Sequence, residues 1–345
     1  MTRLAIKASG MVTAVGFNSP ASCAAMRAGV SGVSKANLWD PESGEYIGIG
    51  KVNLPHWWEG LGKLAELLAP AIQECLAAAK PARSDQIPIL LGVADQGRPH
   101  RFAGIDDQLL EEVEYRLNLK HNPDSKVIPR ERVSGVVAIN EARQIIESRR
   151  AAACIVAGAD SFLQQEVTEA YMQQRRILTP GNSNGFIPGE AGCAVLVALG
   201  GDQRQGELEI TGLGLGQEKA TIESDQPMRG EGLTQAIRAA LADAGLALHD
   251  TSYRITDLNG EHYKFKEASF AQGRLLRKIT EHHALWHPIE FIGDIGSAIV
   301  PCVLAVALHA GQKGYGVGER ALCHFSSDNG ERAAMVTKFT PGRTD

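Results

Sequence analysis

The sequence has little that favours nucleic acid or a membrane as a partner. Its 345 residues carry 35 lysines and arginines against 40 aspartates and glutamates, a formal net charge of -5. This composition offers no broad basic surface for nucleic acid or anionic lipid. No run approaches the roughly 20 apolar residues of a membrane span, and the first residues lack the long apolar segment of a signal peptide. We therefore expect a cytoplasmic protein with no nucleic acid partner and no membrane span.

The sequence also lacks the cysteine pairs of metal sites and disulfide frameworks. It has no CxxC pair, which argues against a zinc ribbon and against a disulfide-stabilised fold. The scattered cysteines, mostly in apolar surroundings, are Cys23, Cys75, Cys154, Cys193, Cys302 and Cys323. We interpret those in apolar strands, Cys154 and Cys193, as inert core thiols.

One histidine-rich stretch, EHHALWH, contains His282, His283 and His287. The spacing of His283 and His287 suits two metal ligands on one helical face. Solvated histidines at a loop-helix junction explain the stretch better. We expect no metal and no cofactor.

What the sequence does contain is an alternation of strand-like and helical runs, which favours an α/β protein with largely buried sheets. With 44% hydrophobic and 22% charged residues, the chain is expected to be globular. Residues 87–94 and 152–159 are continuous apolar runs of strand length. Between them, apolar residues recur at helical spacing over 135–146. This part of the chain predicts a buried strand that follows a helix packed on it.

The second half repeats this pattern. Residues 208–216 are typical of a strand, although the GLGLG within them on its own favours a tight turn. Residues 233–244 have helical periodicity and are followed by Gly245, a helix stop. The polar segment 200–207 separates the two parts. We predict two comparable α/β halves, 1–203 and 204–345.

Five segments, in order, resemble the thiolase-fold condensing enzymes, specifically the β-ketoacyl-acyl-carrier-protein synthases. They match that family's opening strand and first helix, the strand after the nucleophile helix, a glycine-rich passage, a late helix and the closing turn and strand. The segments are SGMVTAVGFNSPASCAAMRAGVSGV, ACIVAGADSFL, NGFIPGEAGCAVLVAL, FIGDIGSAIVPCVLAVAL and ALCHFSSDNGERAAMV. The resemblance implies a thiolase-like fold of two similar α/β halves in a five-layered α-β-α-β-α arrangement.

The resemblance also implies which positions carry chemistry. Aligning VSGVVAINEA with the family's ATGxxAIGEA puts Arg132 at the nucleophilic cysteine. The first catalytic histidine of the family aligns with Asn259 in DLNGEH, and the second with Asp294 in GDIGSA. The phenylalanine of the family's GFGG gate aligns with Asp328. A guanidinium is no nucleophile and stays protonated, so Arg132 cannot replace the cysteine. With the two histidines and the gate phenylalanine replaced as well, every position that carries condensation is changed.

These substitutions allow three interpretations. Arg132 paired with Asp294 or Asp328 either fills the old cavity with a charge-paired cluster or forms a polar pocket that binds an anionic or polar ligand. In the third interpretation Ser134 is a substitute nucleophile, although a helix N-cap is its simpler role. Glu261 and His262 follow Asn259 closely, so we include them among the candidate pocket residues.

The function that the resemblance implies is a degenerate β-ketoacyl synthase-like protein. Such a protein acts as a binding or partner subunit in a lipid or polyketide context, comparable to chain-length factors. The alternative is an acyltransferase, decarboxylase or thioester hydrolase that acts on acyl-carrier-protein or CoA thioesters without a cysteine. The expected partners are a second copy of the chain or a synthase-like subunit, and an acyl carrier protein. The resemblance places the dimer contact at strands that include AACIVAGAD.

A tryptophan pair lies outside any periodic run. Trp57 and Trp58 occur in LPHWWEG, residues 54–60. They either anchor an interface or lid, or pack a surface loop.

Overall fold

The computed structural model describes residues 3–79, 86–201, 206–278, 280 and 283–342. Most of its strands belong to one large mixed sheet, in the order β10-β9-β11-β12-β8-β1-β7-β6-β4-β5. The strands of its first half are β1 (Leu4–Val12), β4 (Ile89–Gly92), β5 (Lys126–Ile128), β6 (Ala153–Ser161) and β7 (Glu190–Leu199). Those of its second half are β8 (Glu207–Gln217), β9 (Tyr253–Thr256), β10 (Ala284–Trp286), β11 (Arg320–Ser326) and β12 (Glu331–Thr340).

The two halves of this sheet have the same topology. In the first half β1 pairs antiparallel with β7, β7 antiparallel with β6, and β6, β4 and β5 run parallel. In the second half β8, β12, β11, β9 and β10 repeat this order and these directions. The halves meet where β1 pairs antiparallel with β8, for example Leu4 opposite Ile210. This internal repeat is the pattern that the sequence predicted.

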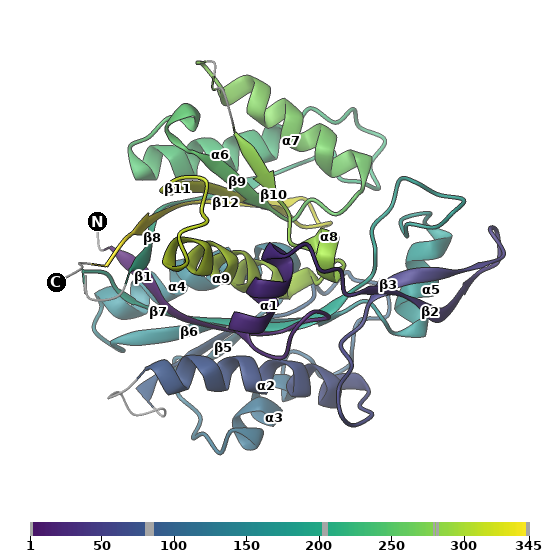
Figure 1. Ribbon diagram of the computed structural model, residues 1–345, viewed down its shortest axis with the longest axis horizontal. Coiled ribbons are helices and arrows are strands. Elements are labelled where there is room, and N and C mark those ends of the chain that lie inside the picture. The colour runs from purple at the N-terminus through teal and green to yellow at the C-terminus, as the bar shows by residue number, and fades with distance from the viewer. Residues whose placement is uncertain (1–2, 80–85, 202–205, 279, 281–282, 343–345) are drawn as a thin grey trace.

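Helices cover and separate the two halves of the sheet (Figure 1), which gives the predicted five layers. The outer helices are α2 (Gly60–Ala78) and α3 (Gln108–Arg116) on one side and α6 (Glu231–Ala244) and α7 (His262–Leu275) on the other. Between the two sheet halves lie α4 (Ser134–Glu147) and α9 (Ile299–Gln312). The remaining elements are α1 (Ser19–Arg27), α5 (Gln165–Gln173), α8 (Ile289–Ile292) and the hairpin of β2 (Val33–Asp40) and β3 (Glu45–Gly50).

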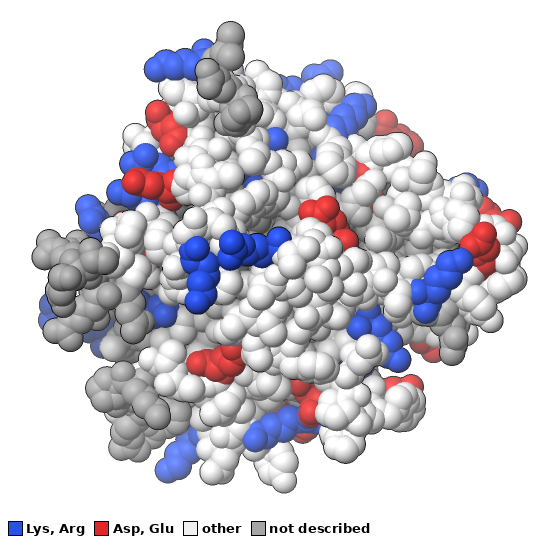
Figure 2. Space-filling model, viewed as in Figure 1, with Lys and Arg blue, Asp and Glu red and all other residues white. Residues whose placement is uncertain are grey.

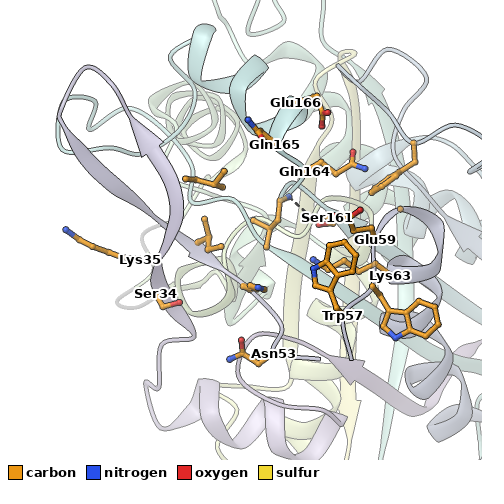
Figure 3. A pocket seen from close by; sticks show the side chains of 17 residues that line it. Ser34, Lys35, Asn53, Trp57, Glu59, Lys63, Ser161, Gln164, Gln165 and Glu166 are labelled. Carbon is orange, nitrogen blue, oxygen red and sulfur yellow. Dashed lines mark hydrogen bonds between the residues drawn. The ribbon is translucent and has the colours of Figure 1, made fainter. Parts of the chain in front are cut away.

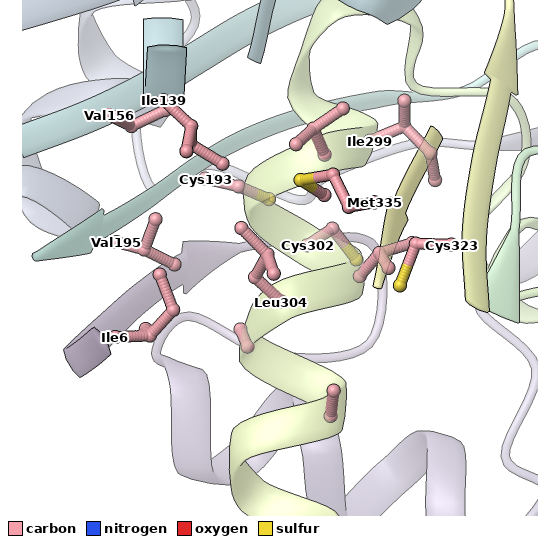
Figure 4. Close-up of a cluster of buried hydrophobic side chains, with 14 of the residues drawn as sticks. Ile6, Ile139, Val156, Cys193, Val195, Ile299, Cys302, Leu304, Cys323 and Met335 are labelled. Atoms are coloured by element: carbon pink, nitrogen blue, oxygen red, sulfur yellow. The ribbon is translucent and has the colours of Figure 1, made fainter. Parts of the chain in front are cut away.

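The central layer holds the main core. Helix α9 is apolar on nearly all sides and contacts strands of both sheet halves, as expected of a helix buried between two sheets. Figure 4 shows part of this core, where Cys193 of β7 and Cys302 of α9 lie among Ile6, Val195 and Leu304. All six cysteines are free and buried, as expected for core thiols.

The GLGLG segment is part of strand β8, so it forms no tight turn. A Cβ added to Gly212, Gly214 or Gly216 would lie 2.1, 2.1 or 2.2 Å from a backbone carbonyl oxygen of α6. Alternate residues of a strand share one face, so these glycines together leave room for the helix backbone. They are required for close packing of α6 on β8.

One further expectation is wrong, and another is not tested by the described residues. Strand β6, which contains most of AACIVAGAD, pairs with β7 on one side and β4 on the other. It has no free edge, so the expected dimer contact through this strand is wrong. The end strands of the described sheet are β5 and β10. The predicted boundary at residue 203 lies outside the described residues.

The histidine stretch does not form one helical face. His282 lies outside the described residues, and residues 284–286 form strand β10 between His283 and His287. Nε2 of His283 lies 3.0 Å from the hydroxyl of Thr251. Within the described ranges, no group of histidine, cysteine, aspartate and glutamate side chains is arranged to hold a metal ion.

Two features of the molecule bear on nucleic acid and membranes as partners: the distribution of charged side chains on its surface and the apolar character of its helices. On the face shown in Figure 2, acidic and basic side chains are interspersed, and the basic ones form no continuous field. No helix in the described part of the chain is both long and apolar enough to cross a membrane.

Candidate functional site

The residues aligned with the family's catalytic positions follow strands of both halves of the sheet and lie in contact with one another. Arg132 lies in the short 3-10 turn Glu131–Val133, which follows β5 and leads into α4. Asn259 follows β9, Asp328 follows β11, and Asp294 follows β10 and α8. Strand β5 belongs to the first half of the sheet, whereas β9, β10 and β11 belong to the second half and run antiparallel to it. The fold nevertheless brings four distant segments to one place.

The guanidinium of Arg132 is fully buried and surrounded by carboxylates. Its Nη2 donates to Oδ2 of Asp294 at 2.7 Å. Its Nη1 lies 2.9 Å from Oε1 of Glu131 and 3.5 Å from Oδ1 of Asp328. The predicted contact of Arg132 with Asp294 is present, and Asp328 lies at the limit of hydrogen-bond distance. These partners offset the cost of burying the cation.

Asn259 donates to the same carboxylate oxygen of Asp294 that accepts from Arg132. Nδ2 of Asn259 donates to Oδ2 of Asp294 at 2.7 Å and to Oε2 of Glu261 at 3.1 Å. The other oxygen of Asp294 accepts from the backbone N–H of Gly296 at 3.0 Å. Burial by itself would raise the pKa of Asp294, but Arg132, Lys264 and the bond from Asn259 lower it to about 2. Asp294 is therefore a carboxylate at neutral pH.

Arg176 is a second buried cation of this site, and the sequence analysis missed it. It donates to Glu261 from Nε at 2.7 Å and from Nη2 at 3.1 Å. It also donates to Asp328 from Nη1 at 2.7 Å and from Nη2 at 3.2 Å. Burial opposes ionisation of Asp328, yet Arg176 and Arg132 hold the pKa of its carboxyl well below the usual range. Such paired bonds are the strongest geometry for arginine and carboxylate.

A third buried arginine, Arg98, extends the site. Its Nη1 donates to Asp160 at the end of β6, and its Nη2 donates to Glu131 at 2.8 Å. Asp160 also accepts from the hydroxyl of Ser297 at 3.0 Å. The guanidinium of Arg98 lies 4.1 Å from the centre of the Phe162 ring. These contacts connect Arg98 to Arg132 through Glu131.

We call this set of side chains the Arg132 cluster. It comprises Arg98, Glu131, Arg132, Asp160, Arg176, Asn259, Glu261, Asp294 and Asp328. Glu131 at its centre has φ = +50°, a left-handed conformation that is rare for a residue with a side chain. Its carboxylate contacts two arginines and accepts from the backbone N–H of Asp328. Charge pairing thus holds an unfavourable backbone conformation at the start of α4.

Two candidate residues lie elsewhere or have other roles. His262, expected in the pocket, is exposed at the first position of α7, and its backbone N–H donates to Asn184. Glu261, the N-cap of the same helix, is buried instead. Ser134 is the first residue of α4 and not its N-cap, which is Val133. Its buried hydroxyl donates to the carbonyl of Glu131 at 2.5 Å and so is already engaged.

A small cavity lies at the outer side of the Arg132 cluster. This cavity has about 200 Å³ and is lined by Arg98, Arg176, Asp328 and residues around them. Arg132, Asn259 and Asp294 are not among its lining residues. The guanidinium of Arg132 is thus turned to its carboxylates and not to this space.

A larger cavity lies next to Ser161 at the end of β6 (Figure 3), and we call it the Trp57 cavity. It has about 930 Å³ and lies between the β2-β3 hairpin, the loop before α2 and the start of α5. Two of its lining residues, Lys63 and Ser161, donate at 2.6 and 2.8 Å to Oε2 of Glu190, which is itself buried and does not line the cavity. The sequence analysis singled out Trp57 and Trp58, which line this cavity, but not the polar residues around them.

The chemistry available at the Arg132 cluster is charge pairing. Its arginines stay protonated, and its carboxylates are held by them. The thiols offer no substitute, since burial raises the pKa of Cys23, Cys154 and Cys323 to about 12. In neutral solution these cysteines are uncharged and weakly nucleophilic.

Comparisons with known proteins agree with this fold. Residues 133–200, which begin directly after Arg132, match the family model of the β-ketoacyl synthase N-terminal domain. A search of curated protein sequences finds no match.

Among solved structures, the AntDE:AntF complex, a type II PKS acyl-carrier protein with its ketosynthase, is similar with a TM-score of 0.78 and 14% identity. That match covers 98% of this chain and 99% of the other. The ketosynthase ApeO in complex with its chain length factor ApeC from Xenorhabdus doucetiae gives a TM-score of 0.73 at 16% identity, with 98% of each chain covered. The ishigamide ketosynthase/chain length factor gives 0.72 at 19% identity, with 97% and 99% covered. The chain therefore has the thiolase-like ketosynthase fold over nearly its whole length.

Proposed function

We propose that this chain is a partner subunit of a ketosynthase-type complex in polyketide or fatty acid biosynthesis and does not itself condense acyl units. The observation that carries the proposal is the state of Arg132. It occupies the position that the family resemblance gives to the cysteine, and it is fully buried and bonded to Asp294. A guanidinium accepts no acyl group.

The neighbouring positions support the same conclusion. Of the two residues aligned with the histidines, Asn259 donates to Asp294, and Asp294 also accepts from Arg132. Neither presents a cationic donor to the enolate that decarboxylation forms. Ser134 is a poor substitute nucleophile, because its hydroxyl is buried and bonded to a carbonyl.

A partner role is supported by two of the similar structures, which contain a ketosynthase together with a chain length factor. The described sheet offers β5 as an end strand that leads directly to Arg132. The unpaired backbone groups of an edge strand are suited to pairing with a second chain. We propose that a synthase-like subunit, or a second copy, pairs along β5.

Mass spectrometry of the intact protein tests whether the chain reacts with acyl thioesters. After incubation with octanoyl-CoA and malonyl-CoA, we expect neither a covalent adduct nor release of CO2. Arg132→Cys should likewise release no CO2 and form no condensation product, since the positions aligned with the histidines stay changed. An adduct on the wild-type chain that disappears in Ser134→Ala would instead establish a covalent enzyme.

Reconstitution with a ketosynthase tests the proposed role as a partner subunit. The chain is co-expressed with a cysteine-bearing ketosynthase from the same organism, and the complex is measured by light scattering. We expect a one-to-one complex, and a product that requires both subunits. A chain that stays a monomer at micromolar concentration, alone and with the ketosynthase, would contradict the partner role.

A further inference from the structure

The Trp57 cavity has the size and lining of a small-molecule site. Its volume of about 930 Å³ is near the upper end of the range for such sites, roughly 300–1,000 Å³. Figure 3 shows Trp57 beside Glu59 and Lys63, with Ser34 and Lys35 of the hairpin across the cavity. The cavity therefore has walls from separate elements and a polar lining.

The tryptophan pair differs in how each ring is held. Trp58 is covered by the guanidinium of Arg116, 4.5 Å from the ring centre, and Arg116 is itself bonded to Glu112 at 2.8 Å and to Glu66. Trp57, its neighbour, is 82% exposed. A fixed Trp58 thus keeps the loop in place while Trp57 presents an uncovered indole to the cavity. Folding gains little from that indole, and its open ring face beside a large cavity is available to contact a bound molecule.

The charges of the cavity are balanced. Lys63 is paired with Glu190 at 2.6 Å, and Lys35 with Glu45 at 2.8 Å. Among the described residues, the remaining charged groups of the lining, Lys51, Glu59 and Glu166, are without a salt bridge, and the carboxylates outnumber the lysine. Such a lining has no positive field for a nucleotide or another polyanion.

The uncharged polar groups complete the pattern. Asn53 and Gln164 each offer amide donors and an acceptor, and Ser34 offers a hydroxyl. An apolar ring face together with planar groups that both donate and accept matches the chemistry of a sugar, which has an apolar C–H face and a rim of hydroxyls. We propose that the Trp57 cavity binds a neutral saccharide, with a sugar ring on the indole of Trp57 and hydroxyls bonded to Asn53 and Gln164.

Isothermal titration calorimetry of the full chain tests this site. The ligands are maltotriose, cellotriose and triacetylchitotriose, with ATP as the polyanion for comparison. We expect saturable binding of at least one trisaccharide and none of ATP. Trp57→Ala should weaken the binding by about tenfold or more, because an aromatic contact residue dominates such a site, and Trp57→Phe should retain part of it.

A matched control is Trp39→Ala, which removes another exposed tryptophan, 52% exposed, that does not line the cavity. Its binding should equal that of the wild type. The proposal is overturned if none of the three trisaccharides binds, if Trp57→Ala binds as the wild type does, or if ATP binds equally well. Analytical ultracentrifugation of the same variants adds one outcome: a change of oligomeric state in Trp57→Ala without saccharide binding would assign the cavity to a protein partner instead.

Discussion

Asp160 and Ser161 are neighbours at the end of β6, but they serve two regions of opposite character. Asp160 accepts from Arg98 inside the Arg132 cluster, whereas Ser161 lines the Trp57 cavity and donates to Glu190. Successive side chains of a strand point to opposite faces. One strand end therefore separates a region filled with paired charges from a region open to a ligand.

The difference lies in what the charged groups have as partners. In the cluster, Arg132 and Arg176 are both buried and both contact more than one carboxylate. In the cavity, Lys63 is paired with Glu190, while Glu59 and Glu166 at the rim are without a salt bridge in the described part of the chain. We infer that the cluster contributes to stability and that the cavity is available for binding. Each prediction below separates these two roles.

The largest effect is expected for Arg132→Ala. It leaves Asp294 buried without its cation, which costs roughly 3–5 kcal/mol of unfolding free energy. Arg132→Lys should recover only part of this, because lysine lacks the planar fork of donors. Urea titration at neutral pH measures both. A loss below about 0.5 kcal/mol, the range of ordinary surface substitutions, would show that the cluster does not stabilise the fold.

A neighbouring pair of arginines gives a matched comparison. Arg176→Ala removes a buried cation that bonds to Glu261 and Asp328, and we expect a loss of about 3 kcal/mol. Arg175→Ala removes an exposed cation whose pair with Glu42 is exposed as well, and it should change stability by less than about 0.5 kcal/mol. The same urea titrations apply. Equal losses from the two variants would contradict the distinction between buried and exposed charge.

Acid should weaken the cluster. Arg132 and its neighbours hold the folded-state pKa of Asp294 at about 2, below its usual value of 3.8, so the unfolded chain binds the proton more readily. The stabilisation is present above the unfolded value and is lost as pH falls through the folded one, amounting to about 2 kcal/mol. Unfolding free energies measured from pH 7 to pH 2 should show a smaller acid-side loss in Arg132→Ala. Parallel curves for the two proteins would contradict this assignment.

The smallest effects are expected at the cavity, where the two tryptophans should differ. Trp58→Ala removes the ring that stacks with Arg116 and should cost about 1 kcal/mol. Trp57→Ala removes an exposed ring and should change the unfolding free energy by less than about 0.5 kcal/mol. Thermal or urea unfolding distinguishes them. A large loss for Trp57→Ala would mean that its indole serves the fold and not a ligand.

Much of the architecture could be predicted from local patterns. The apolar runs and helical periodicities gave α4, β6, β8 and α6, and Gly245 does end α6 with φ = +67°. These patterns suffice because each element is specified by side chains close together in the chain. The resemblance to condensing enzymes then placed Arg132, Asn259, Asp294 and Asp328 at one site, and the structure shows them in one hydrogen-bonded group.

The tertiary structure alone decided that Arg98 and Arg176 are buried in the cluster and which strands lie at the ends of the described sheet. Arg176 and Asp328 are 152 residues apart, and nothing near Arg176 in the sequence marks it as buried. Strand β6 is apolar, but an apolar composition does not distinguish a central strand from an edge strand. Its sequence therefore did not reveal that β7 and β4 pair with its two edges. The sequence by itself determined the elements and their order, since these depend on local periodicity. Partners depend on which distant segments the sheet brings together, and a single sequence carries no local signal for that.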